Sequence, residues 1–391
     1  MTQLRISWID DAKFIAILCV IIGHAFSLIS GFRGYDEINL FIVAFNMPLF
    51  ALLSGITSYK SLTKIMTFSD LISYLNKILW RVGVPTVIWT LLAMTVGYGL
   101  QGRFERCLIS GVLFLIVCVF AYLIMFLLSG YWKEKAKQLF PLLILPICLW
   151  NQSVWYFVYV IMAMFLASVS SYIANQFVRS CLVFCFIFSL LSYLIAPLSP
   201  FFSTLELCLP FIVGYIYAYK NGMVSPLATP PYKKIISSLF LLLIGVVCFI
   251  KYYSIPHQFY LLNMNQAFHA GEMQIFVLRQ ISAVTLSVAI ISFCQILPKS
   301  YNYISSVGAM TFGIYPIHSQ LLGILKTLGV YIDTNILWYK LLVFFFFVIL
   351  LLSISMILVL AFRKSTLLKA LLLGETNSFN EAINVCIRVN K

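Results

Sequence analysis

Charged residues are scarce in this sequence. Only 10% of its 391 residues are Asp, Glu, Lys or Arg, whereas 62% are hydrophobic, and the mean hydropathy is +1.01. A soluble domain of this length would not carry so few charges and so much apolar surface. The composition therefore excludes that class and indicates a polytopic membrane protein.

A concentrated basic patch is also missing. The net charge of +14 is spread over Lys and Arg residues that stand between apolar blocks, whereas nucleic-acid-binding proteins gather such charge on one face. Scattered basic residues are typical of membrane topology, so no nucleic-acid partner is expected. The ten cysteines show neither CxxC nor Cys/His metal spacing, and we predict no disulfide framework and no metal site. Asp10 and Asp11 directly precede the first apolar run, so that run is not expected to be a cleaved signal peptide.

What the sequence does contain is a series of apolar blocks long enough, or nearly long enough, to span a bilayer. Twelve candidate blocks lie at about 10–30, 38–58, 82–99, 107–129, 139–150, 153–173, 179–197, 201–219, 235–251, 274–297, 303–323 and 338–362. The block at 139–150 is short and contains two prolines, so eleven spans is an alternative. We predict an all-α polytopic membrane helix bundle of about 10–12 transmembrane helices.

The basic residues also predict an orientation. If the N-terminus is cytoplasmic, most of the 26 Lys and Arg residues fall in inside segments, which favours that orientation. Between the second and third blocks, residues 62–80 read as an amphipathic surface helix that starts near Thr67, with Asp70 completing a capping box. We expect a transmembrane domain over residues 1–362 and a cytoplasmic tail over residues 363–391.

The stretch from Asp10 to His24 combines ionisable groups with a very apolar helix pattern. Lys13 and His24 are eleven positions apart, which leaves them about 20° apart around a helix axis and about 16 Å apart along it. Asp10 falls near the same face. Ionisable groups that face hydrocarbon are costly, so this stripe is expected to face protein or a water-filled cavity.

Several motifs, taken together, resemble acyltransferase family 3, the integral-membrane enzymes that O-acylate bacterial surface glycans, and in particular its fucose 4-O-acetylase-like branch. Lys13 and His24 resemble the family's pattern of a basic residue, ten residues and a histidine, and the segment from Phe45 to Gly55 resembles Phe-His-Met-Pro-Leu-Phe…Ser-Gly, with Asn46 in place of a histidine. The segment from Thr311 to His318 resembles Thr-Leu-Gly-Ile-Tyr-Leu-Ile-His. Weaker echoes are Arg81 with Pro85, Trp155-Tyr156-Phe157, and Leu209-Pro210-Phe211…Gly214.

The resemblance implies transfer of an acyl group, expected to be acetyl, from cytoplasmic acetyl-CoA to a hydroxyl of a surface or lipid-linked polysaccharide, in the inner membrane of a bacterium. Such a reaction needs a base for the hydroxyl proton, and an imidazole is suited to that task. We expect His24 to be this base. Other expected catalytic residues are Glu206, Arg279 and His318. Glu206 should orient the imidazole or bind the acceptor, and Arg279 or His318 should stabilise developing negative charge. We expect Lys13, Lys77 and Arg81 to bind the phosphates of acyl-CoA, and Asp10, Asn46 and Trp155 to contact substrate.

No permanently bound cofactor is expected; acyl-CoA is a substrate, and the glycan acceptor and membrane lipids are the other partners. Neither a Ser-His-Asp elbow nor a metal-ligand cluster is present in the sequence, which favours direct transfer over a covalent acyl-enzyme. Two alternatives stay open. One is a transporter or flippase whose buried polar stripe lines a substrate path, although no internal repeat stands out. The other is a catalytically silent relative that uses the same pocket for binding.

Overall fold

The computed structural model describes residues 6–29, 35–100, 207–221, 231–254, 273–297, 302–332 and 336–375, with five single positions between 164 and 172. Within these residues the regular structure is helical, and the one β-type pairing is an isolated bridge between Ile29 and Ile332. The all-α prediction is therefore confirmed. The predicted blocks at 107–129, 139–150 and 179–197, and most of the block at 153–173, lie outside the described residues.

In the parts that the structure describes, the helices follow the apolar blocks, except that the predicted block at 303–323 is divided into two helices by a turn at Ala309 and Met310. They are α1 (Ser7–Phe26), α2 (Tyr35–Leu62), α3 (Phe68–Ile78), a π-helical turn η1 (Leu79–Gly83), α4 (Val84–Leu100), α9 (Cys208–Asn221), α10 (Pro231–Tyr253), α12 (Met273–Cys294), α13 (Asn302–Gly308), α14 (Thr311–Thr327), α15 (Leu337–Lys364) and α16 (Thr366–Leu373).

Four of the described helices are long and apolar enough to cross a membrane. These segments are Glu37–Leu62, Tyr232–Tyr253, Gln274–Cys294 and Leu337–Lys364. Large apolar side chains of α10 and α15 point outward, including Phe240 at 61% and Trp338 at 80% exposure. In water such surfaces would be unfavourable, but in a bilayer they meet lipid tails. The outer surface of the bundle is thus that of a membrane protein.

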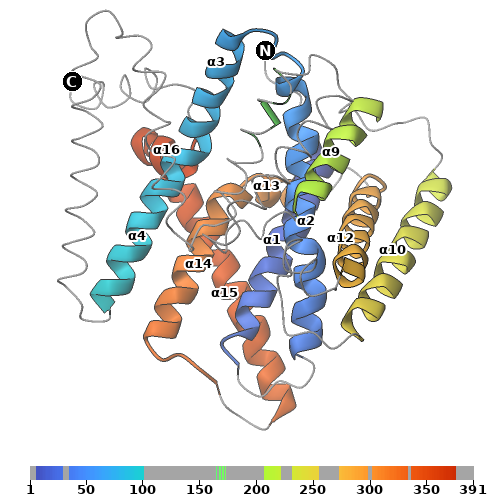
Figure 1. The fold of residues 1–391 in the computed structure, drawn as a ribbon. Coiled ribbons are helices and arrows are strands. Elements are labelled where there is room, and N and C mark those ends of the chain that lie inside the picture. Colours follow the sequence, from blue (N-terminus) through green and yellow to red (C-terminus); the bar gives the residue numbers. More distant parts are fainter. Residues whose placement is uncertain are drawn as a thin grey trace, which may run out of the picture.

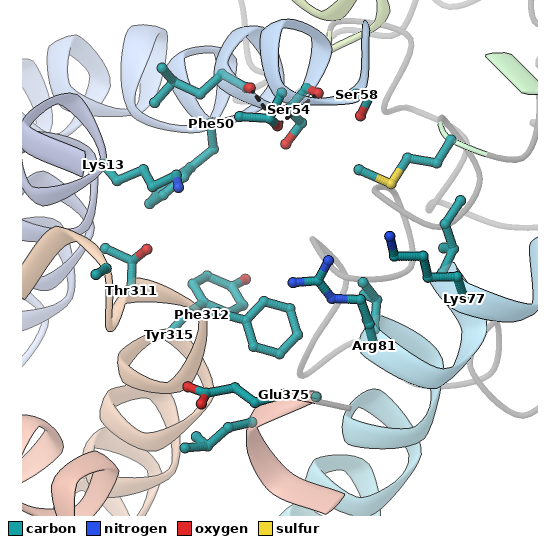
Figure 2. A pocket seen from close by; sticks show the side chains of 18 of the residues that line it. Lys13, Phe50, Ser54, Ser58, Lys77, Arg81, Thr311, Phe312, Tyr315 and Glu375 are labelled. Atoms are coloured by element: carbon teal, nitrogen blue, oxygen red, sulfur yellow. Dashed lines mark hydrogen bonds between the residues drawn. The ribbon is translucent and has the colours of Figure 1, made fainter. Parts of the chain in front are cut away.

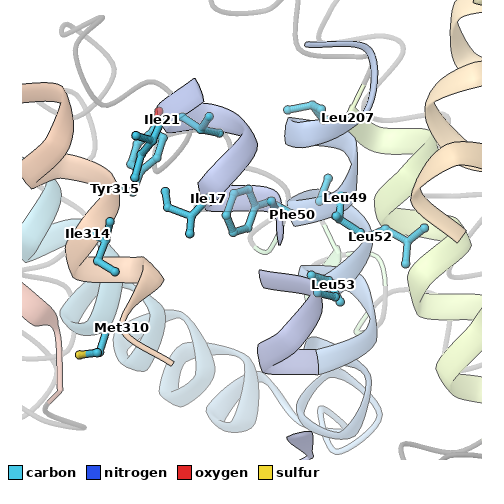
Figure 3. Close-up of a cluster of buried hydrophobic side chains, with 14 of the residues drawn as sticks. Ile17, Ile21, Leu49, Phe50, Leu52, Leu53, Leu207, Met310, Ile314 and Tyr315 are labelled. Atoms are coloured by element: carbon cyan, nitrogen blue, oxygen red, sulfur yellow. The ribbon is translucent and has the colours of Figure 1, made fainter. Parts of the chain in front are cut away.

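Helix α1 lies at the centre of the described bundle, between α2 on one side and α14 and α15 on the other (Figure 1). Its Ile17 and Ile21 are fully buried and pack in one cluster with Leu49 and Leu53 of α2 and Ile314 of α14 (Figure 3). Helices α10 and α12 pack against each other at one side of the bundle, and α4 and α16 lie at the other (Figure 1). This packing fixes the position and rotation of α1, which carries Lys13 and His24.

Helix α3 is the amphipathic segment that the sequence predicts between the second and third blocks. Its capping box is formed in full: the backbone N–H of Asp70 donates to Thr67 Oγ1 at 3.1 Å, and the backbone N–H of Thr67 donates to Asp70 Oδ2 at 2.9 Å. Apolar Leu71, Leu75 and Ile78 are buried on one face, as the periodicity requires. The helix runs directly into η1, a π-helical turn, and then into α4.

Candidate active site

Two histidines from distant parts of the sequence meet in the interior. Nδ1 of His24 lies 3.2 Å from Nε2 of His318, and the two rings stack with their centroids 5.1 Å apart. His318 is fully buried, whereas His24 is partly exposed. The sequence proposed both residues independently, from motifs at opposite ends of the chain, and the structure brings them together.

The hydrogen bonds of His318 assign the tautomers of the pair. Nδ1 of His318 lies 3.0 Å from the carbonyl oxygen of Ile314, and a carbonyl only accepts, so this nitrogen carries the proton. In a neutral ring Nε2 of His318 is then the acceptor, and Nδ1 of His24 must donate to it. That arrangement leaves Nε2 of His24 unprotonated. Nε2 of His24 is therefore the nitrogen that can accept a proton, and it belongs to the partly exposed ring of the pair.

A cavity of about 650 Å³ opens at one end of the bundle, where α1, α4 and α14 begin and α2 and α15 end. Lys13 of α1 lies on one side of it, with Lys77 of α3 and Arg81 of η1 across from Lys13 (Figure 2). The three cations that the sequence proposed for phosphate binding thus line a single cavity. The π-helical turn adds one residue to the backbone at Arg81, a distortion that is frequent at functional sites.

The cavity wall is polar along α2. Ser54, Thr57, Ser58 and Ser61 line it, at the spacing that places residues on one face of a helix. Tyr315 of α14 lines the opposite wall, and its ring makes an edge contact with His318 at a centroid distance of 5.7 Å. Tyr315 therefore connects the cation-lined cavity to the histidine pair. Because α1 is a single helix from Ser7 to Phe26, its rise places His24 about 16 Å from Lys13 along the helix axis.

The other proposed residues have different surroundings. Asp10 is buried, and its Oδ1 lies 3.3 Å from Lys13 Nζ, so it pairs with a cation of the cavity. Asn46 is buried and accepts a hydrogen bond from the backbone N–H of Met47 at 2.6 Å. Arg279 is buried in α12, with its guanidinium carbon 5.9 Å from the centre of the Tyr252 ring. Glu206 and Trp155 lie outside the described residues.

The sequence alone did not single out two charged residues of the cavity, Arg363 and Glu375. Both line it, and Arg363 Nε donates to Glu375 Oε1 at 2.9 Å. Basic residues are common at the cytoplasmic ends of membrane spans, so Arg363 at the end of the last predicted span gave no separate indication of a binding role. The four hydroxyl residues of α2 that line the cavity could have been predicted to share one helix face, because they are spaced three and four residues apart within and just after an apolar block.

Residues 6–360 match the family model that is described as an acyltransferase domain. The match covers the histidine pair and every helix from α1 to α14. The chain belongs to this acyltransferase 3 family. No curated protein and no solved structure matches the sequence significantly. The protein is accordingly a membrane acyltransferase, and the predicted family is confirmed at this level, while the fucose 4-O-acetylase-like branch stays a prediction.

Proposed function

We propose that this acyltransferase moves an acetyl group from cytoplasmic acetyl-CoA to a hydroxyl of a surface or lipid-linked polysaccharide, with His24 as the general base. The observation that carries the proposal is the histidine pair, in which Nε2 of His24 is left as the acceptor. The cation-lined cavity about 16 Å away along α1 supports a polyanionic donor.

Each residue then has a defined task in the reaction. The acceptor hydroxyl gives its proton to Nε2 of His24 as its oxygen attacks the thioester carbonyl. His318, held by the Ile314 carbonyl, keeps the other nitrogen of His24 protonated. When the tetrahedral intermediate collapses, the C–S bond breaks, and the protonated His24 returns the proton to the departing thiolate of CoA. The products are an ester and CoA, and the base is regenerated.

The cavity supports a location for the donor. The phosphates of CoA are negatively charged, and the clustered Lys and Arg side chains of the cavity supply the positive charge that binds them. The hydroxyl groups on the polar face of α2 can form hydrogen bonds with the amides in the long thiol arm of CoA. With the N-terminus in the cytoplasm of a bacterium, the cavity opens inward and the histidine pair lies toward the outer half of the inner membrane. A cytoplasmic donor then serves an acceptor at the outer surface. Glu206, Trp155 and Arg279 keep their proposed roles toward the acceptor and the developing charge.

The test is release of CoA from acetyl-CoA by purified protein in detergent, with a lipid-linked glycan fraction as acceptor. Wild-type protein and a Cys19→Ala control, altered on the same helix, should release CoA, and His24→Ala should not. Equal release by His24→Ala would overturn the role of the base. Detergent removes the two compartments that transport needs, but it leaves catalysis possible. If no variant consumes acetyl-CoA in detergent and the wild-type protein moves glycan across the membrane of vesicles, the transporter alternative replaces the proposal.

A further inference from the structure

The chain beyond α15 turns back and closes one side of the cavity. Trp89 of α4 donates its indole N–H to the carbonyl oxygen of Leu372 at 3.0 Å, in a buried contact that fixes α16 on α4. Gly374 follows with a φ of 60°, and a Cβ atom there would overlap the backbone carbonyl of Arg81. Only glycine fits this close approach. The next residue, Glu375, is thereby delivered to the cavity wall (Figure 2).

Glu375 brings a negative charge into a site built from positive ones. Among the described residues that line the cavity, it is the single acid, against the four cations Lys13, Lys77, Arg81 and Arg363. Its carboxylate accepts from Arg363 Nε at 2.9 Å and lies 3.4 Å from Lys369 Nζ. Both side chains of the Arg363–Glu375 pair keep about a third of their surface exposed, at 33% and 32%. The pair is therefore accessible to a ligand in the cavity.

We propose that Arg363 is a fourth phosphate ligand of the donor cavity and that Glu375 occupies its place until a phosphate of the donor displaces it. A carboxylate and a phosphate use the same planar donors of a guanidinium, so the two compete for Arg363. A partly exposed ion pair contributes little to stability, and a polyanion held by three further cations can break it. Glu375 thus reduces the positive charge of the cavity before the donor binds and lowers the affinity for the donor.

This inference rests on the proposed function for the identity of the donor, although not for the existence of an anion site. Arg363 and Glu375 both lie beyond residues 6–360, the range that matches the family model. Arg363 lies in the last turn of α15, and Glu375 follows α16, which packs on α4 and brings Glu375 back to the cavity. Arg363 and Glu375 thus adjust a donor affinity to which Lys13, Lys77 and Arg81 of the matched range also contribute.

Calorimetric titration of CoA into the purified full-length protein tests the proposal. Glu375→Gln keeps the shape of the side chain but removes its charge, and it should tighten CoA binding about two- to five-fold. Arg363→Gln should weaken binding about tenfold or more. In the double variant, Glu375→Gln should give no gain, because its target cation is gone. Glu37→Gln is the matched control: it changes net charge equally, but Glu37 is at the beginning of α2, and its carboxylate accepts from Tyr253 at 3.2 Å.

The outcomes separate this proposal from the proposed function. If Lys77→Gln and Arg81→Gln weaken CoA binding while Glu375→Gln and Arg363→Gln bind as wild type, the donor cavity stands and the inference is wrong. If CoA binds no variant but inorganic pyrophosphate binds more tightly to Glu375→Gln than to wild type, the anion subsite stands and the donor is wrong. Equal tightening by Glu375→Gln and Glu37→Gln would overturn the inference, because net charge alone would then explain it.

Discussion

Gly55 of α2 and Gly214 of α9 lie at a reciprocal contact between two helix backbones. A Cβ atom on Gly55 would overlap the carbonyl of Phe211, and a Cβ atom on Gly214 would overlap the carbonyl of Leu52. In a bilayer the hydrophobic effect does not drive helices together. Small residues let two helix backbones approach closely, and the resulting van der Waals contacts stabilise the packing. The segments Phe45–Gly55 and Leu209–Gly214, which resemble family motifs, therefore each end in a glycine at the contact between α2 and α9.

This contact predicts that Gly55→Ala and Gly214→Ala each lower the stability of the folded protein. A backbone carbonyl cannot rotate aside, so the helices must separate, at a cost of about 1–3 kcal/mol or more. Gly323 of α14 is the control, because a Cβ atom there would meet nothing within 4 Å, and Gly323→Ala should raise stability by about 0.5–1 kcal/mol. Thermal unfolding in one detergent compares the three variants. Similar melting temperatures for all three would contradict the packing role.

The histidine pair predicts different outcomes for two substitutions of His318. Glutamine can place an acceptor oxygen near the position of Nε2, whereas leucine cannot accept a hydrogen bond. His318→Leu should therefore lower kcat, by at most the about 10²–10⁴-fold that a positioned general base contributes, and His318→Gln should retain clearly more activity. Initial rates at saturating donor decide this. Equal losses in both variants would show that the hydrogen bond to His24 is not what matters.

Spacing along one helix could be predicted from the sequence, but contacts between distant helices could not. The distance from Lys13 to His24 and the capping box of Thr67 and Asp70 follow from local geometry, and the capping box is confirmed. The contact of His24 with His318 joins positions 294 residues apart. The sequence placed both among the expected catalytic residues but indicated no contact between their rings. Neither periodicity nor resemblance indicated Glu375, because its position depends on how α16 folds back onto α4.

The cation cluster predicts that Lys77→Gln and Arg81→Gln raise KM for the donor with little change in kcat. Each substitution removes a charge-assisted contact worth about 1.5–3 kcal/mol, which corresponds to about 10- to 100-fold in affinity. Lys60→Gln is the control, since Lys60 lies in the last turn of α2 and is not among the described residues that line the cavity. Added salt should raise KM of the wild type more than that of either variant. A fall in kcat at constant KM would instead place these residues in the chemical step.

The capping box predicts that α3 loses stability in acid. Hydrogen bonds from the Thr67 hydroxyl and from the backbone of Thr67 and Met66 lower the pKa of Asp70 below its ordinary value of 3.8. The folded helix favours the carboxylate form of Asp70. The stability that this carboxylate gives to α3 is therefore complete above the ordinary pKa of Asp70 and is lost as the pH falls through its lowered pKa in the folded state. Amide exchange of α3, corrected for intrinsic rates, should accelerate over that range. Thr67→Val removes the principal hydrogen bond, so its α3 should exchange faster at neutral pH and respond less to acid. An unchanged acid response in that variant would assign the pH dependence to another group.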